Sequence, residues 1–216
     1  MIALIFDMDG VIVDSNGMHR ESWEVFNRRY GLETTEEMHQ RMYGKRNDQI
    51  VRDFFGDGIT ALEVDARGRA KEQLYREMMG GRTRSFQVPG LRDFLERHRD
   101  LPMGVASNAE PENVAFVLDE LGLRPYFRVV VDGHQVHHPK PHPDIYLRAA
   151  ELLETEPANC VVFEDSHSGA AAAVAAGMRV IGLRTTFDNL PGTLLTIDNF
   201  LSGDLESWLQ AQMRSV

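Results

Sequence analysis

Four groups of acidic, hydroxyl, amide and cationic side chains stand beside short apolar runs of this chain. They are Asp7 with Asp9, Ser107 with Asn108, Lys140, and Glu164 with Asp165. Phosphoryl transfer requires this set of chemistries, because cations and hydrogen-bond donors must offset the negative charge on the phosphoryl oxygens. Clustered carboxylates alone would repel such a group, whereas a hard cation that bridges them removes the repulsion. The residue types therefore predict phosphoryl transfer at a site that holds Mg²⁺.

These side chains can meet only if the apolar runs lie side by side in one sheet. The runs cover residues 2–6, 103–106, 129–131, 160–163 and 180–183. Helical periodicity lies between them, at residues 91–98, 111–121, 143–153 and 168–176. Alternating strands and helices predict an α/β fold with a doubly wound parallel sheet, similar to a Rossmann fold. Since ligands of such sheets bind beyond the carboxyl ends of the strands, we expect the four groups to converge there.

Residues 15–86 interrupt this alternation with helical periodicity and no strand pattern. The features that indicate helices are the common face of His19, Trp23, Phe26 and Tyr30, the capping-box spacing of Thr34 and Glu37, and a polar helix over residues 62–79. A short terminal helix is expected over residues 205–214. We therefore predict a core domain made of residues 1–14 and 87–216, with an inserted helical cap domain made of residues 15–86.

The composition limits the partners and the compartment. A formal net charge of −10 argues against a non-specific nucleic-acid surface, which must offset a dense row of phosphates. The single cysteine, Cys160, lies in an apolar run and cannot form an internal disulfide, which suits a reducing cytoplasm. No apolar run approaches the roughly 20 residues that a membrane-spanning helix needs. We expect a cytoplasmic monomer that acts on a small phosphorylated metabolite, without nucleic-acid or membrane partners.

The segment Phe6-Asp7-Met8-Asp9-Gly10-Val11-Ile12-Val13-Asp14-Ser15 resembles the first motif of haloacid dehalogenase-like phosphohydrolases. Ser107, Lys140 and the pair Glu164-Asp165 match the other three motifs in order and spacing. The resemblance covers residues 2–185 and includes an insertion where this family carries its small helical cap. The beta-phosphoglucomutase-like branch is the most similar, through His19 and the run from Lys140 to Asp144.

The resemblance implies roles for the matched residues. Asp7 would attack phosphorus to form an aspartyl-phosphate, and Asp9 would protonate the leaving oxygen and later activate water. Mg²⁺ would be held by Asp7, the backbone carbonyl of Asp9 and Asp165, with Glu164 as either a ligand or a neighbour of the ligands. Lys140 would neutralise charge on the phosphoryl group. The expected substrate contacts come from Gly10, His19, Lys45, Arg46, Ser107 and Asn108.

Two alternatives to a phosphatase remain open from the sequence. A beta-phosphoglucomutase-like sugar-phosphate mutase is the first, but those mutases carry a basic residue soon after the second-motif serine, where this chain has Ala109 and Glu110. Their cap arginine is also displaced here, since the segment contains Lys45 and Arg46. A non-enzymatic phosphoacceptor signalling domain is the second alternative. Such domains lack both an acid at the position of Asp9 and a cap.

Several charged residues have simpler interpretations. His134, His137, His138 and His142 follow no common zinc spacing and are interpreted as solvated loop side chains. Arg67, Arg69, Lys71 and Arg76 are interpreted as one exposed helix face, paired with Glu63, Glu72 and Glu77. Neither group is assigned chemistry.

Overall fold

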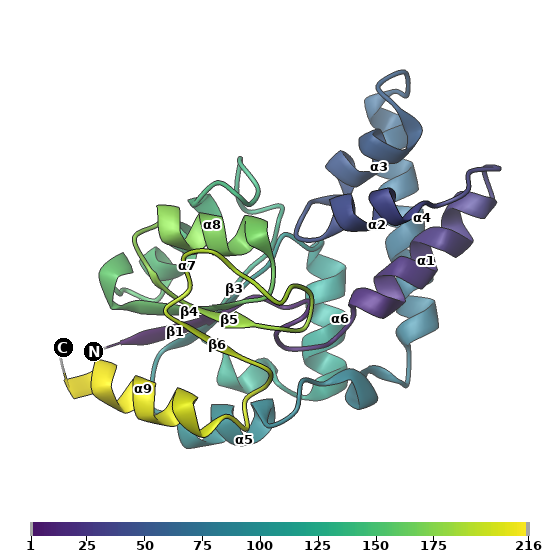
Figure 1. Ribbon diagram of the computed structural model, residues 1–216. Helices are drawn as coiled ribbons and strands as arrows, with labels where there is room; N and C mark the ends of the chain where they lie inside the picture. Colours follow the sequence, from purple (N-terminus) through teal and green to yellow (C-terminus); the bar gives the residue numbers. More distant parts are fainter. Residues whose placement is uncertain (1, 215–216) are drawn as a thin grey trace.

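The computed structural model describes residues 2–214 and contains one parallel six-stranded sheet, in the order β3-β2-β1-β4-β5-β6 (Figure 1). The strands are β1 (Ala3–Phe6), β2 (Met103–Ala106), β3 (Val129–Val131), β4 (Cys160–Glu164), β5 (Arg179–Leu183) and β6 (Leu195–Ile197). The sequence predicts the first five. The chain order reverses between β1 and β4, which creates the crevice where doubly wound sheets bind ligands.

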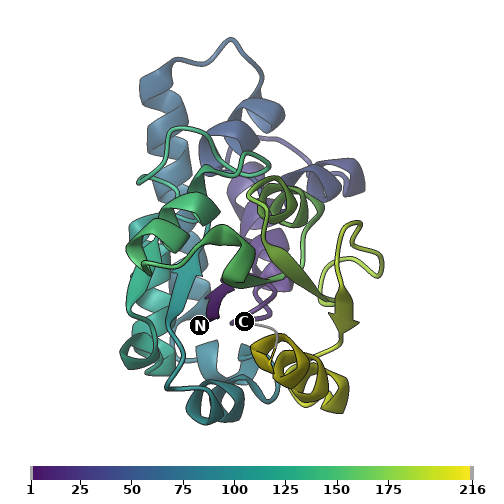
Figure 2. The ribbon, with the colours of Figure 1, turned by 90° about the vertical axis from the view of Figure 1, so that its left-hand side faces the viewer.

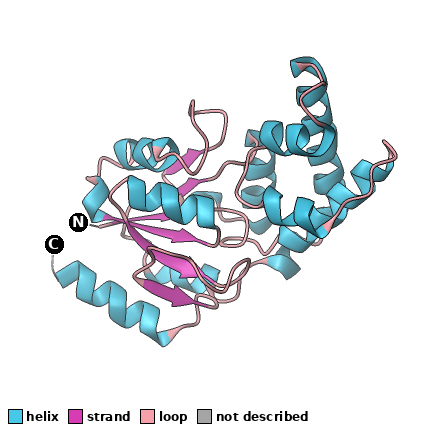
Figure 3. Ribbon diagram, turned by 45° about the horizontal axis from the view of Figure 1, so that its top comes forward, coloured by secondary structure: helices cyan, strands magenta, loops and turns pink. Residues whose placement is uncertain are grey.

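Helices cover both faces of the sheet (Figures 1 and 3). On one face lie α5 (Leu91–Arg97), α6 (Pro111–Leu121) and α9 (Gly203–Arg214), and on the other lie α7 (Asp144–Leu152) and α8 (His167–Ala175). Alternation along β1 explains this arrangement, because Leu4 and Phe6 pack with the first group and Ala3 and Ile5 with the second. Short 3₁₀ turns lie at Thr83–Phe86, Arg124–Tyr126 and Pro157–Asn159. The predicted α/β class is confirmed.

Four helices between β1 and α5 form a separate layer beyond one end of the sheet. They are α1 (Asn16–Arg28), α2 (Glu36–Met42), α3 (Asn47–Phe55) and α4 (Ala61–Met79). Seen from the opposite end, they lie behind the sheet (Figure 2). Trp23, Phe26 and Val51 belong to a hydrophobic cluster of their own, which shares no buried member with the clusters of the sheet. This layer corresponds to the predicted helical cap.

Two connecting segments join the cap to the sheet, and they run next to each other. The amide of Asp14 donates to the carbonyl of Phe86 at 2.7 Å, and the amide of Val88 donates to the carbonyl of Ile12 at 3.1 Å. These bonds lie next to the places where the chain is predicted to pass between the core and the cap. The boundaries of the domains, 14/15 and 86/87, stay a prediction.

Two local predictions in the cap are wrong. Thr35 rather than Thr34 caps α2, because its hydroxyl accepts the Met38 amide, while the Thr34 hydroxyl accepts from the Asn27 side chain. Tyr30 lies beyond the end of α1 and is 49% exposed, so it is not part of the buried face. Within residues 2–214, no helix has the length and apolarity to cross a bilayer.

Candidate active site

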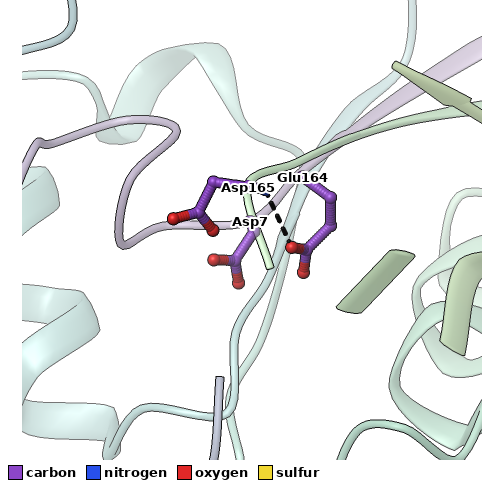
Figure 4. Close-up of side chains that lie close together, drawn as sticks. All are labelled: Asp7, Glu164 and Asp165. Atoms are coloured by element: carbon purple, nitrogen blue, oxygen red, sulfur yellow. Dashed lines mark hydrogen bonds between the residues drawn. The ribbon is translucent and has the colours of Figure 1, made fainter. Parts of the chain in front are cut away.

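The predicted groups converge beyond the carboxyl ends of three adjacent strands. Asp7 follows β1, Ser107 follows β2, and Glu164 with Asp165 comes at the end of β4. Carboxylate oxygens of Asp7, Glu164 and Asp165 lie within 4.8 Å of one another (Figure 4). All three side chains are buried. Register pairing of β1 with both β2 and β4 sets these positions, so this cluster is a product of the sheet itself.

Lys140 enters this cluster from the segment before α7. Its ammonium nitrogen lies 2.6 Å from Asp7 Oδ1 and 2.7 Å from Glu164 Oε1. Burial alone would lower the pKa of Lys140, but the two carboxylates outweigh burial and raise it. Lys140 is therefore a permanent positive charge at neutral pH.

Hydrogen bonds hold the Glu164 carboxylate in place, and one of them comes from the backbone of Asp165 (Figure 4). Its Oε1 accepts from Lys140 and from the Tyr146 hydroxyl at 2.8 Å. Its Oε2 accepts from the backbone amides of Asp165 and Ser166, both at 2.9 Å, and from the Ser166 hydroxyl at 3.0 Å. Five hydrogen bonds saturate the carboxylate and fix it as an anchor for Lys140.

Asp7 and Asp165 carry more negative charge than their surroundings offset. Burial raises the pKa of Asp7 to about 7, and although Lys140 opposes this, Glu164 adds to it. Burial, together with Glu164 and Asp7, raises the pKa of Asp165 well above its usual value. Among residues 2–214, the side-chain donors to the Asp165 carboxylate are the neutral groups of Thr186 and Asn16. A positive charge between these carboxylates would stabilise both in the ionised form.

Asp9 points towards the cap. Its Oδ1 accepts from the Ser15 hydroxyl and lies 3.3 Å from Nε2 of His19, on α1. Burial would raise the pKa of Asp9, but His19 and the two hydrogen bonds outweigh burial and lower it. The Lys71 ammonium, which can only donate, lies 2.7 Å from His19 Nδ1, so this nitrogen accepts and Nε2–H donates to Asp9.

A cavity lies between the strand ends and the cap. Its lining includes Asp9, Ser107 and Asn108 from the core and His19, Trp23, Tyr43, Lys45, Lys71 and Glu72 from the cap. The Ser107 hydroxyl accepts the Ala109 amide at 3.2 Å, which leaves its proton free to donate into the cavity. Both layers of the molecule thus contribute polar groups to one cavity.

Comparisons with known proteins agree with this geometry. The sequence profile of the haloacid dehalogenase-like hydrolases matches residues 1–177. The chain belongs to this family. Fructose-1-phosphate phosphatase YqaB of Escherichia coli is 35% identical over 182 residues, which cover 84% of this chain and 95% of that protein. The phosphorylated carbohydrates phosphatase of Thermotoga maritima is 34% identical over 192 residues, covering 85% of each chain.

The family's capped fold is also found by structural comparison. The crystal structure of beta-phosphoglucomutase from Clostridium difficile superposes with a TM-score of 0.87, covering all of this chain and 98% of that one at 24% identity. At this identity the likeness concerns the fold alone. It confirms the predicted sheet with an inserted helical cap.

Lys45 and Arg46, the two predicted substrate contacts from the cap loop, lie in different places. Lys45 lines the cavity, but its ammonium pairs with Asp53 at 2.6 Å. Arg46 lines a neighbouring cleft and pairs with Asp48 at 3.3 Å. Their predicted contacts with substrate stay predictions.

Asn108 and Gly10 have structural partners. The Asn108 amide donates to the Gly44 carbonyl at 2.7 Å and accepts from the Lys140 amide at 3.2 Å, so it joins the cap to the Lys140 segment. Gly10 has a φ of +77°, and a Cβ atom there would overlap the Asp165 carboxylate. Glycine is therefore required beside this acid.

The sequence analysis did not predict the buried charged pair that lines the cavity, Lys71 and Glu72. The assignment of Lys71 and Glu72 to an exposed helix face is wrong, because they are only 1% and 3% exposed. They occupy the buried stripe of α4 that also contains Val64 and Tyr75. This seven-to-eight-residue spacing from Val64 is visible in the sequence, and charged residues on such a stripe indicate a polar site.

Proposed function

We propose that the protein is a Mg²⁺-dependent phosphatase that hydrolyses a small phosphomonoester, such as a sugar phosphate, through an aspartyl-phosphate on Asp7. The observation that carries the proposal is that the two acids after β1 face different surroundings. Asp7 lies in the acid cluster with Lys140, whereas Asp9, two residues later, faces the cavity and the cap. Phosphoryl transfer needs a nucleophile on one side of phosphorus and a proton donor at the leaving oxygen on the other. The positions of Asp7 and Asp9 suit these two roles.

The residues present fit a divalent cation. Asp7 and Asp165 offer oxygen ligands of the kind that Mg²⁺ prefers. Burial first, and neighbouring carboxylates second, raise the pKa of both groups, and a cation between them would offset both effects. We assign these two side chains and the Asp9 carbonyl as ligands, and Glu164 as the anchor of Lys140. A bound Mg²⁺ would neutralise phosphoryl oxygens and help to orient the group for in-line attack.

The residues of the chain then perform two steps. In the first, an oxygen of Asp7 bonds to phosphorus and the phosphorus–oxygen ester bond breaks. Asp9 gives the leaving oxygen a proton, which it takes up from solvent when the negative phosphoryl group binds beside it and raises its pKa. In the second, Asp9 takes a proton from water, whose oxygen bonds to phosphorus while the bond to Asp7 breaks and phosphate leaves. Lys140 and the Ser107 hydroxyl offset the charge of the phosphoryl oxygens throughout.

The mutase alternative is disfavoured by the residues after Ser107. A mutase must hold a second phosphate opposite the first. Here Glu110 stands after the serine and accepts from the Asn47 amide of the cap at 3.2 Å. An acid and an amide offer a second phosphate no cationic partner. The absence of such a partner at this pair favours transfer to water over transfer to a second sugar phosphate.

Phosphate release from sugar phosphates, nucleotides and small phosphorylated acids tests the proposal, with Mg²⁺ or with a chelator. We expect many turnovers with Mg²⁺ and none in chelator. A coupled assay for isomerisation of glucose 1-phosphate should remain silent. Release of about one slow equivalent per chain would instead indicate a phosphoacceptor domain, and isomerisation without net phosphate release would indicate a mutase.

A further inference from the structure

A buried ion pair forms the wall of the cavity on the side of α4. The Lys71 ammonium lies 2.9 Å from Glu72 Oε1, with both side chains inaccessible to bulk solvent. Lys71 also contacts His19 and lies 5.0 Å from the centre of the Trp23 ring. The positive charge of Lys71 on this wall is therefore balanced by the adjacent negative charge of Glu72.

The core holds Glu72 in this position. Asn113, on α6, donates from Nδ2 to Glu72 Oε2 at 2.5 Å and accepts from Arg76 Nη1 at 2.5 Å. Burial would raise the pKa of Glu72, but Lys71 and His19 outweigh it and lower the pKa to about 2. Glu72 is consequently ionised at neutral pH, with both oxygens engaged from separate layers of the molecule.

Every lysine that lines the cavity among residues 2–214 has an acidic partner within the cap. Lys71 pairs with Glu72, and Lys45 pairs with Asp53. No other described residue of the lining carries an ammonium or guanidinium group. Hydroxyl groups would find both donors and acceptors there, whereas a carboxylate or second phosphate would be desolvated beside Glu72 without a free counter-charge.

We propose that Glu72 sets the charge selectivity of the enzyme by neutralising Lys71, so that the cavity accepts phosphomonoesters whose remaining part is an uncharged polyol and rejects those with a second anionic group. The inference rests on the proposed phosphatase function and specifies its substrate class. A site built from matched charges discriminates strongly, because the wrong ligand leaves a buried charge without a partner.

Matched substrate pairs test the selectivity of the unmodified protein. The pairs are fructose 1-phosphate with fructose 1,6-bisphosphate, glucose 6-phosphate with 6-phosphogluconate, and glycerol 3-phosphate with 3-phosphoglycerate. In each pair that is turned over with excess Mg²⁺, we expect kcat/KM to favour the uncharged member by about ten-fold or more. Equal values, or a preference for the anionic members, would overturn the inference.

Glu72→Gln tests the residue itself. The amide retains the shape and can still accept from Asn113, but Lys71 is left with an uncompensated charge. We expect the ratio of kcat/KM, anionic over uncharged, to rise by about ten-fold, mainly through KM. Glu77→Gln is the matched control, because Glu77 is an exposed acid on the same helix that contacts Gln73. Its ratio should equal that of the unmodified protein.

The double variant Lys71→Met with Glu72→Gln separates charge from shape. It contains no unpaired buried charge, so it remains testable even if Glu72→Gln alone does not fold. Its ratio should return to that of the unmodified protein, and a ratio as high as that of Glu72→Gln would show that Lys71 is not responsible. If no phosphomonoester at all releases phosphate, the proposed function fails. Turnover without charge preference defeats only the present inference.

Discussion

Among the described residues, the charged neighbours of the Asp7 carboxylate are Lys140 and the carboxylates of Asp9, Glu164 and Asp165. Lys140 contacts it directly, while Glu164 and Asp165 lie in the same cluster. Because Glu164 is already saturated with hydrogen bonds, the remaining imbalance falls on Asp7 and Asp165. The site thus combines a fixed ammonium with two acids that a cation would complete.

Replacement of Asp7 by Asn should abolish turnover without unfolding the protein. The amide is nearly isosteric with the carboxylate but is a far weaker nucleophile, so we expect phosphate release to fall by about 1,000-fold or more. Circular dichroism and the thermal midpoint report whether the variant is folded. A folded Asp7→Asn protein with undiminished phosphate release would remove Asp7 from the nucleophile's role.

Replacement of Asp9 by Asn should affect substrates according to their leaving group. A sugar alkoxide needs protonation as it leaves, so its transfer should slow by about 100-fold or more. The p-nitrophenolate of p-nitrophenyl phosphate needs less protonation, so its first step should slow less. Since water activation is also lost, intact-mass measurement should then show one added phosphoryl group on Asp7. Equal losses for both substrates and no adduct would contradict an acid/base role.

At the residue scale, the sequence predicts the site residues at the ends of the strands better than the cap residues on the opposite side of the cavity. Asp7, Ser107 and Asp165 follow from motif order, because strand ends converge in any parallel sheet. Lys71 and Glu72 were assigned to an exposed helix face because an alternating charge pattern normally indicates solvent. The packing of α4 on α1, through His19 and Trp23, and on α6, through Asn113, makes that surface an interior one.

At the scale of elements, the loop between α2 and α3 forms part of the cap side of the cavity. The Gly44 carbonyl accepts from Asn108 at 2.7 Å and from the Ser168 hydroxyl at 3.4 Å. Gly44 has a φ of +71°, and a Cβ atom there would overlap the Ser168 and Ser166 side chains. The loop therefore docks on the core through its backbone, at a position where no side chain fits.

Replacement of Gly44 by Ala should prevent this docking. We expect kcat/KM to fall by about ten-fold or more, because misplacement of a closing loop by about 1 Å impairs positioning of the substrate. Gly31→Ala is the control, since Gly31 also has a φ of +71° but faces open space. Both variants place a side chain at the same positive φ, so only Gly44→Ala should lose activity beyond any common loss of stability. Equal kinetics for the two variants would show that docking of the loop is dispensable.

Element boundaries follow the sequence where a local signal exists. Pro111 begins α6 and Leu121 ends it, as the helical periodicity over residues 111–121 predicts. The strand β6 was not predicted, because its three residues carry no period of their own and depend on pairing with β5. Tertiary pairing decides such short strands, and no local pattern reports it.

At the scale of the whole molecule, the core side and the cap side of the cavity differ in their charge balance. The core end of the cavity concentrates acids that need a cation, whereas the cap end contains matched charges. The net charge of −10 adds repulsion for any polyanion that approaches. Binding of a divalent cation should therefore change the stability of the entire fold as well as its activity.

This coupling should appear as a pH-dependent effect of Mg²⁺ on thermal stability. The pKa of Asp7 is about 7 in the folded protein, raised from its ordinary 3.8, so the folded state holds a proton that the unfolded state loses between these values. Without metal, the stability that this group contributes is complete below about pH 4 and is lost as the pH rises through about 7. Glu72 acts oppositely, with its contribution lost only as the pH falls from about 4.5 towards its pKa of about 2. Scans between about pH 5 and about pH 8 therefore leave the contribution of Glu72 unchanged while Asp7 titrates.

In chelator, we expect the thermal midpoint to fall across this interval. Mg²⁺ at about 100 times its Kd should restore about 2.7 kcal/mol, or roughly 5 to 10 °C, near pH 8. Its effect should shrink towards pH 5, where protons compete for the same carboxylates. Asp7→Asn removes both a ligand and the titrating group, so its midpoint should depend less on pH and respond less to Mg²⁺. A Mg²⁺ effect of equal size at both pH values, or one unchanged in Asp7→Asn, would show that the cation binds elsewhere.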